Sequence, residues 1–165
     1  MKKFELTTDT KIFLGRKLFR IKALISFGNV KVGDVGGYIE KEENLSQSGD
    51  AWVYGNAWVS GDAEVYGNAE VSGNAEVSGN AKVYGDAKVY GNADYATASG
   101  FGSEYRTTTF FKLKNSDEIG VRCGCFYGTL KEFKEKVKET HGESKKAKEY
   151  LMLADLMEYR FLEEK

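Results

Sequence analysis

The chain has 165 residues, a formal net charge of −1 and 41% hydrophobic residues, which is enough apolar material for one domain with a packed core. A net charge so close to zero excludes a global attraction to nucleic acid or to an anionic membrane surface. No apolar run is long enough to span a bilayer, and the first ten residues lack the hydrophobic stretch of a secretory signal. We therefore expect a cytoplasmic protein that binds neither nucleic acid nor a membrane.

Residues 1–36 are predicted to form a β cap. Apolar and polar residues alternate from Lys17 to Leu24, as in a strand with one buried face. Gly15 is placed to turn this strand back against residues 11–14. A cap is needed here because the repeat that follows would otherwise present open strand edges and an apolar end.

The middle of the chain is an unbroken run of eight six-residue units from Gly49 to Ala96. The units read GDAWVY, GNAWVS, GDAEVY, GNAEVS, GNAEVS, GNAKVY, GDAKVY and GNADYA. Within each unit Ala and Val are two residues apart, so they share one face of a short strand and are expected to point inward. The Gly-Asn or Gly-Asp pair tolerates the backbone angles of a tight corner.

Written as Ala-x-Val-(Tyr/Ser)-Gly-(Asn/Asp), the unit resembles the hexapeptide repeat of left-handed parallel β-helix proteins. The resemblance covers residues 49–96, with a degenerate unit upstream that places Leu45 at the Ala position. It implies a triangular solenoid with three units per turn, so that residues eighteen apart stack. The side-chain pairs implied are Glu64 with Lys82, Glu70 with Lys88, and Tyr66 with Tyr84. On this basis residues 37–98 are expected to form the solenoid.

Residues 99–165 are predicted to form a β-hairpin and two helices. Residues 107–114 and 118–126 read as two strands joined by a turn. Thr129 and Glu132 form a capping box that begins a helix, and Gly142 ends it. A second helix is expected from Ser144 to about Phe161. The expected fold class is thus mainly β: a left-handed parallel β-helix with an N-terminal β cap, a C-terminal hairpin and two α-helices.

The sequence offers no catalytic or metal-binding group that stands out, and no cofactor is expected. Cys123 and Cys125 lack further Cys or His nearby to complete a metal site, so two buried thiols in the hairpin are predicted. His141, the only histidine, is placed at a helix C-terminus, where the helix dipole favours a cation. Acyltransferases of the hexapeptide family use a histidine near their repeats, and this repeat contains none.

Two sets of side chains are predicted to carry binding. Trp and Tyr are enriched at binding hot spots, and the repeat places several of them outward. These predicted binding residues are Trp52, Tyr54, Trp58, Tyr66, Tyr84 and Tyr90. The second helix has more apolar residues than one narrow stripe needs, so part of it is expected to contact a second subunit or a partner. Its predicted contact residues are Leu153, Leu156, Met157 and Phe161. Caps or sister subunits that cover the aromatic residues are the alternative for the first set.

Taken whole, the chain also resembles small bacteriophage and prophage proteins. The similar segments are the lead-in GGYIEKEENLS, the GNAxV units and the tail CGCFYGTLKEFKEKVKETHG. The resemblance implies an accessory protein in the cytoplasm of a bacterial host cell, which binds a host protein and inhibits a host defence system. We therefore expect a non-enzymatic interaction protein that binds itself, as a homodimer or homotrimer, or a host protein. A hexapeptide-type acyltransferase and a self-assembling structural protein are the two alternatives.

Overall fold

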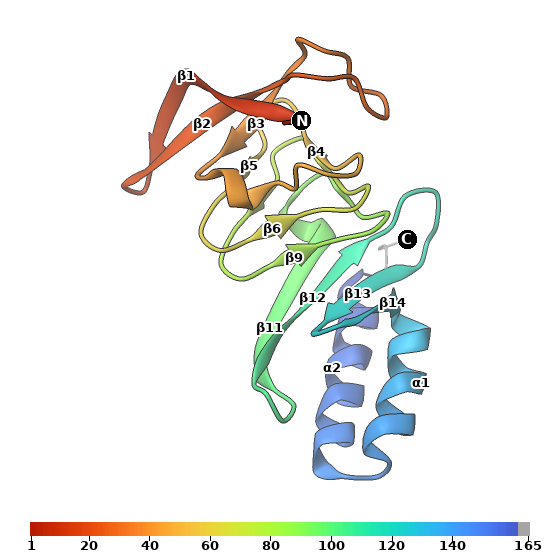
Figure 1. Ribbon diagram of the computed structural model, residues 1–165. Coiled ribbons are helices and arrows are strands. Elements are labelled where there is room, and N and C mark those ends of the chain that lie inside the picture. The colour runs from red at the N-terminus through yellow and green to blue at the C-terminus, as the bar shows by residue number, and fades with distance from the viewer. Residues whose placement is uncertain (162–165) are drawn as a thin grey trace.

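A computed structural model describes residues 1–161. At its N-terminal end two strands form a long antiparallel hairpin, β1 (Phe4–Phe13) and β2 (Arg16–Ala23), and β2 pairs in turn with β3 (Val35–Ile39). This confirms the predicted strand and its turn at Gly15. Figure 1 shows the hairpin at one end of the molecule and the two helices at the other, with the repeat between them.

Each of the first seven repeat units forms one two-residue strand, whereas the eighth, residues 91–96, leads into a longer strand that begins at Tyr95. The strands are β4 (Trp52–Val53), β5 (Trp58–Val59), β6 (Glu64–Val65), β7 (Glu70–Val71), β8 (Glu76–Val77), β9 (Lys82–Val83) and β10 (Lys88–Val89). They pair in parallel with the strand three units further along, so that Glu64 lies beside Lys82 and Glu70 beside Lys88. The eighteen-residue spacing of these pairs is confirmed.

The inward column of the repeat is buried as predicted. From Ala51 to Val89, the Ala and Val of the first seven units are 0–1% exposed and belong to one hydrophobic cluster. Burying one Val side chain contributes about 1.5 kcal/mol or more, so this column is the main source of stability in the repeat. Leu45 joins the column, but it bridges Val65 and so takes the Val position of its unit rather than the Ala position.

The expected fold class is wrong. The sheets are small, mixed and separate, none of them forms a solenoid, and the chain is not a left-handed parallel β-helix. The four sheets have the orders β1-β2-β3-β5-β8, β10-β7-β4, β6-β9 and β11-β12-β13-β14. The physical reason is the strand length. Each unit supplies two paired residues, whereas the flanking segments supply strands of up to ten residues that pair antiparallel.

The C-terminal region is a four-stranded antiparallel sheet, covered by two helices. Its strands are β11 (Tyr95–Phe101), β12 (Arg106–Lys112), β13 (Ile119–Cys123) and β14 (Phe126–Thr129), followed by α1 (Leu130–His141) and α2 (Lys145–Phe161). The two predicted strands match β12 and β13, but β11 and β14 were not predicted. Thr129 caps α1 by accepting a hydrogen bond from the Glu132 backbone N–H at 3.2 Å, as the capping box predicted.

The buried side chains form two clusters. The larger one joins the repeat to the N-terminal strands through Phe4, Ile21 and Ile39, and the smaller one lies between the C-terminal sheet and its helices. The division into 1–36, 37–98 and 99–165 stays a prediction, and residues 162–165 of the last segment lie outside the described residues.

Candidate functional site

The first of the predicted outward aromatic residues is part of the core. Trp52 is 1% exposed, because the N-terminal region covers it with two edge-on rings, Phe4 at 6.3 Å and Phe27 at 5.3 Å. The prediction that Trp52 belongs to an exposed binding surface is therefore wrong. The side chain does point out of the repeat, but a flanking segment packs on it.

The neighbouring aromatic residues of the first units are also partly covered. Trp58 is half-buried against Phe13 of the hairpin, with ring centroids 4.9 Å apart. Tyr54 is half-buried against the main cluster, and burial raises the pKa of its hydroxyl. The N-terminal region thus packs on Trp52 and Trp58, as the alternative interpretation expected.

The later units are different, because their tyrosines border the solvent. Tyr66 and Tyr84 are half-buried and stack on each other with centroids 4.4 Å apart, which confirms their predicted pairing. Tyr127 of β14 meets Tyr84 edge-on at 4.6 Å. We call Tyr66, Tyr84 and Tyr127 the tyrosine cluster. Tyr90 stands apart from it and is 65% exposed.

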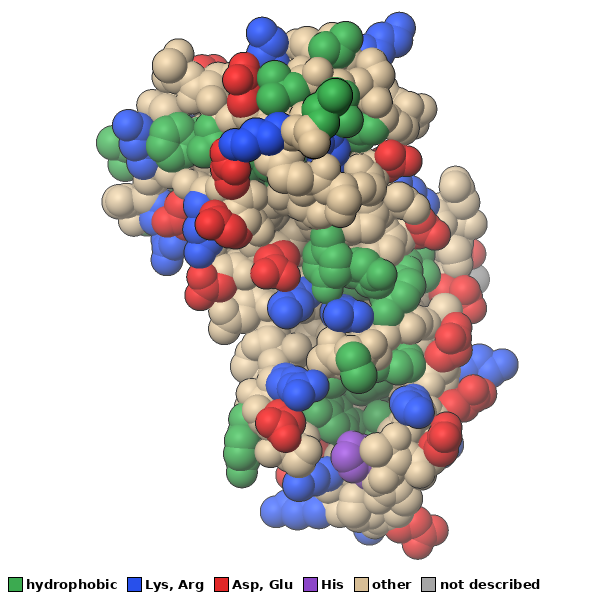
Figure 2. All heavy atoms as spheres, viewed as in Figure 1, with side chains coloured by type: hydrophobic (Ala, Val, Ile, Leu, Met, Phe, Trp, Pro, Cys, Tyr) green, Lys and Arg blue, Asp and Glu red, His purple; other side chains and the backbone are tan. Residues whose placement is uncertain are grey.

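Arg122 of β13 lies over this cluster. Its guanidinium carbon is 5.1 Å from the ring centroid of Tyr84 and 5.9 Å from that of Tyr66, within the range of a cation–π interaction. On the face seen in Figure 2, hydrophobic side chains gather where the repeat meets the C-terminal sheet, and basic side chains lie beside them. The cluster therefore combines aromatic and cationic surface.

A groove of about 590 Å³ lies beside the tyrosine cluster, between the repeat and the C-terminal sheet. Arg122 joins the two, since one face of its guanidinium covers the tyrosines while the side chain also lines the groove. We call this the arginine groove. Its lining residues are Asp62, Glu64, Asn80, Lys82, Arg106, Thr107, Arg122 and Gly124.

Two glycines allow this close packing. A Cβ at Gly85 would collide with the hydroxyl of Tyr127, and a Cβ at Gly124 would collide with the guanidinium of Arg106. Both glycines also have positive φ, +66° and +57°, which L side chains rarely adopt. The absence of a side chain at Gly85 therefore lets Tyr127 pack on the repeat. The absence of one at Gly124 lets Arg106 lie across the turn between β13 and β14.

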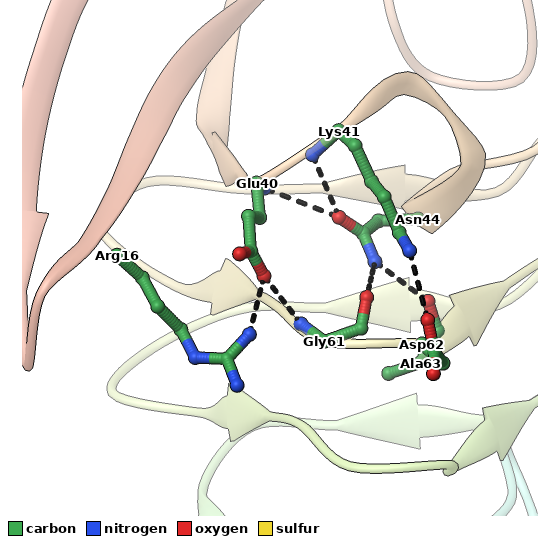
Figure 3. Close-up of polar contacts among 7 residues, drawn as sticks. All are labelled: Arg16, Glu40, Lys41, Asn44, Gly61, Asp62 and Ala63. Atoms are coloured by element: carbon green, nitrogen blue, oxygen red, sulfur yellow. Dashed lines mark hydrogen bonds and ion pairs between the residues drawn. The ribbon is translucent and has the colours of Figure 1, made fainter.

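The acidic residues of the groove already have basic partners. Lys41 donates a hydrogen bond to Asp62 at 2.8 Å, and this bond lowers the pKa of the carboxyl (Figure 3). Lys82 lies 4.0 Å from Glu64. The arginines are different. Among residues 1–161, Arg106 forms no ion pair or side-chain hydrogen bond. Arg122 forms no ion pair there; it donates to the Cys125 carbonyl at the long distance of 3.5 Å and lies against Tyr66.

A second polar cluster has a structural explanation. Asn44 is fully buried, accepts from the backbone N–H groups of Glu40 and Lys41, and donates to the carbonyls of Gly61 and Ala63 (Figure 3). Glu40 accepts from the Gly61 N–H at 2.6 Å and from Arg16 at 2.8 Å, and these contacts lower its pKa. The polar groups of Asn44 and Glu40 therefore have partners, and their hydrogen bonds hold residues 40–44 against residues 61–63 of the repeat.

The cysteines and the histidine lie around a smaller pocket of about 280 Å³ under the C-terminal sheet. Cys123 is half-buried and contacts Thr108 at 3.2 Å and the Tyr150 hydroxyl at 3.8 Å, whereas Cys125 is exposed, so the prediction of two buried thiols is wrong for Cys125. Burial, with the neighbouring thiol, raises the pKa of Tyr150 to about 12.

His141 is the last residue of α1, as predicted. Within residues 1–161 no three acidic, His or Cys side chains are grouped to hold a metal ion.

The predicted contact residues of the second helix divide between the core and the surface. Leu153 and Met157 are buried against the C-terminal sheet and α1, and Phe161 is half-buried. Leu156 is 57% exposed and shares the outer face of α2 with Met152 and Tyr159. The extra apolar face that the composition predicted is therefore present, and Leu156 is the predicted residue on it.

Sequence reasoning missed the two arginines and Tyr127. The repeat's periodicity drew attention to residues 49–96, and the partners come from the non-repeating tail. Arg106 and Arg122 are sixteen positions apart in the sequence, and that spacing alone does not indicate that their side chains lie together. The available signal was the outward direction of Arg122 in the strand 118–126, whose alternation puts it on the face opposite Val121.

The chain matches no protein-family model, and no curated protein matches it either. In the part of the chain that the structure describes, neither helix has the length and apolarity needed to cross a bilayer.

Proposed function

We propose that the protein is a non-enzymatic interaction protein whose binding surface is the arginine groove together with the tyrosine cluster. The observation that carries this proposal is the position of Arg122, which lies over Tyr66 and Tyr84 and also lines the groove. Tyr and Arg are the residues most enriched at hot spots of protein interfaces, where they combine apolar area with directed hydrogen bonds.

The proposed partner is a protein of the bacterial host, and the proposed setting is the host cytoplasm. Support comes from the resemblance of the lead-in, the repeat units and the tail to phage and prophage proteins. Inhibition of a host defence system would be the consequence of such binding. Self-association is the second kind of partner, and the exposed apolar side chains Met152, Leu156 and Tyr159 on α2 favour it.

The test is capture of a partner from bacterial lysate by the tagged full-length chain, with the mass of the complex measured. Wild type is expected to retain a partner that Tyr84→Ala loses. Tyr90→Ala is the matched control, since it removes the same side chain from a neighbouring unit outside the cluster. Retention of the same partner by both variants, or capture of none by wild type, would contradict the proposal.

A light-scattering mass of the purified chain separates the two kinds of partner. If the chain associates with itself through α2, Leu156→Glu lowers the mass to that of one chain and Tyr84→Ala does not. If Tyr84→Ala instead lowers the mass, the contact between subunits would be assigned to the tyrosine cluster.

A further inference from the structure

We propose that the arginine groove binds a carboxylate on an acidic segment of the partner, at a position next to an aromatic residue that packs on Tyr84. This inference rests on the proposed function, because it names the partner chemistry that the same surface recognises.

The first support is the unused donor capacity of the two arginines. The Nε of Arg122 is buried without a hydrogen-bond partner within residues 1–161, and a terminal nitrogen donates to the Cys125 carbonyl at the long distance of 3.5 Å. A buried donor left unpaired costs about 1–3 kcal/mol. Because the Nε of Arg122 has no accessible surface, a carboxylate in the groove would be bound by the terminal nitrogens of the two arginines. Guanidinium groups bind carboxylates through two parallel hydrogen bonds.

The second support is that the arginines are already held in place. Arg122 lies over the stacked rings of Tyr66 and Tyr84, and Arg106 lies against the turn at Gly124. A held side chain loses less conformational freedom on binding than a free one. Both guanidinium groups line the same groove, so an acidic group placed there meets two cations.

The charges on the opposite wall favour one carboxylate over a chain of phosphates. Asp62 and Glu64 stand on the repeat side of the groove, and each has a lysine beside it, Lys41 and Lys82. A single carboxylate placed at the arginines meets the two cations that have no anionic partner. A nucleic-acid strand or a nucleoside diphosphate would bring further negative charge towards the two acids.

The tyrosine cluster supplies the neighbouring apolar contact. The face of Arg122 that does not line the groove covers Tyr84, and both Tyr66 and Tyr84 stay half-buried rather than fully covered. An aromatic side chain next to the bound acid would reach this surface, and aromatic pairs contribute about 0.5–1.5 kcal/mol beyond the area that they bury.

The experiment follows the side-chain Nε–H signals of arginine by NMR in the full-length chain. The probe is a glutamyl-tyrosine dipeptide with both ends blocked, and the matched probe is blocked glutaminyl-tyrosine, which lacks only the charge. Signals are assigned with Arg106→Lys and Arg122→Lys, and Arg160, exposed on α2, is the internal control. We expect a saturable shift of the Arg106 and Arg122 signals with the acidic dipeptide, at least about tenfold weaker binding of the glutaminyl probe, and no shift of Arg160.

Three results would overturn the inference: no saturable shift with the acidic dipeptide, equal binding of both dipeptides, or stronger binding of a nucleoside diphosphate at the same signals. The result is separable from the proposed function through a captured partner. A partner lost by Tyr84→Ala but kept at full affinity by the Arg106→Gln, Arg122→Gln double variant would leave the interaction surface standing and refute the carboxylate contact. An Arg160→Gln, Lys146→Gln double variant, with both changes at exposed positions of α2, controls for the loss of two positive charges.

Discussion

The two ends of the repeat are closed in different ways. At the N-terminal end the outward aromatic residue Trp52 is enclosed by Phe4 and Phe27, and the buried amine of Lys3 donates to the carbonyls of Gly49 and Ala51. At the C-terminal end the outward tyrosines are enclosed on one side only, by Tyr127 and Arg122, and a groove remains beside them.

The difference shows that the repeat does not decide the role of its outward side chains. Trp52 and Tyr84 both point away from the inward Ala and Val column. Trp52 is buried in the core and Tyr84 borders the solvent, because the flanking segments that pack on them differ in sequence and contribute different side chains. The N-terminal strands bring apolar rings, whereas β12 and β13 bring arginines.

The largest expected effect on stability comes from disrupting the inward Ala and Val column, on which both ends of the repeat pack. Val71 is fully buried in the middle of the inward column, and Val71→Asp places an unpaired charge there. We expect a loss of more than about 3 kcal/mol in the free energy of unfolding, with no cooperative thermal transition at neutral pH. Circular dichroism melting measures it. Asn74→Asp, the same charge at an exposed corner, is the control, and an equal loss in both variants would refute the inward column.

The next effect tests the closed end. Trp52→Ala is expected to cost about 3–5 kcal/mol, as for a fully buried large aromatic side chain. Tyr84→Ala, at the open end, is expected to cost less than about 2 kcal/mol, because its ring is only half-buried. Urea unfolding of the two variants side by side gives the difference. If both variants lose the same free energy of unfolding, the two side chains contribute equally to stability despite their different burial.

A smaller effect concerns pH and Lys3. Burial lowers the pKa of Lys3 to about 8, partly offset by Asp50, so between pH 8 and 10.5 the unfolded chain binds more protons at this residue than the folded chain. The contribution of Lys3 to stability therefore rises with pH across this window. The measurement is the unfolding free energy of wild type minus that of Lys3→Met, which should grow from pH 8 to 10.5. A constant or falling difference would contradict the lowered pKa.

The smallest effect is expected at the most exposed tyrosine of the repeat. Tyr90→Ala should change the free energy of unfolding by no more than about 0.5 kcal/mol, because the side chain is 65% exposed and packs on neither end. It should also leave partner capture intact. A loss of binding in Tyr90→Ala would extend the functional surface beyond the tyrosine cluster and weaken the contrast between the two ends.

The sequence predicts local structure well where a pattern repeats. The short strands and the inward Ala and Val column follow from the period of six and from side-chain alternation. The eighteen-residue pairing follows from the resemblance to the hexapeptide repeat. The fold class did not follow, because strand length and sheet membership depend on pairing with segments that lie outside the repeat. The antiparallel hairpin β1–β2, for example, makes one of the sheets mixed.

The candidate site was predictable only in part. Tyr66 and Tyr84 were found because they belong to the periodic pattern, and Trp52 was misplaced for the same reason. Arg122 and Arg106 were not found, since a strand arginine is usually a solvated side chain and only tertiary packing brings these two to the repeat. The direction of a side chain follows from alternation, but what covers it depends on distant segments.

The eighteen-residue spacing also bears on how the chain emerges during synthesis. Each new strand of the repeat finds its partner already made, at the same short separation every time, so the entropy of loop closure is alike at each step. Growth in the direction of translation therefore repeats one closure step of constant chain length. The arginine groove is the exception. Arg122 meets Tyr66 across fifty-six residues of chain, so the binding surface is completed only after the whole repeat and part of the C-terminal sheet have been made.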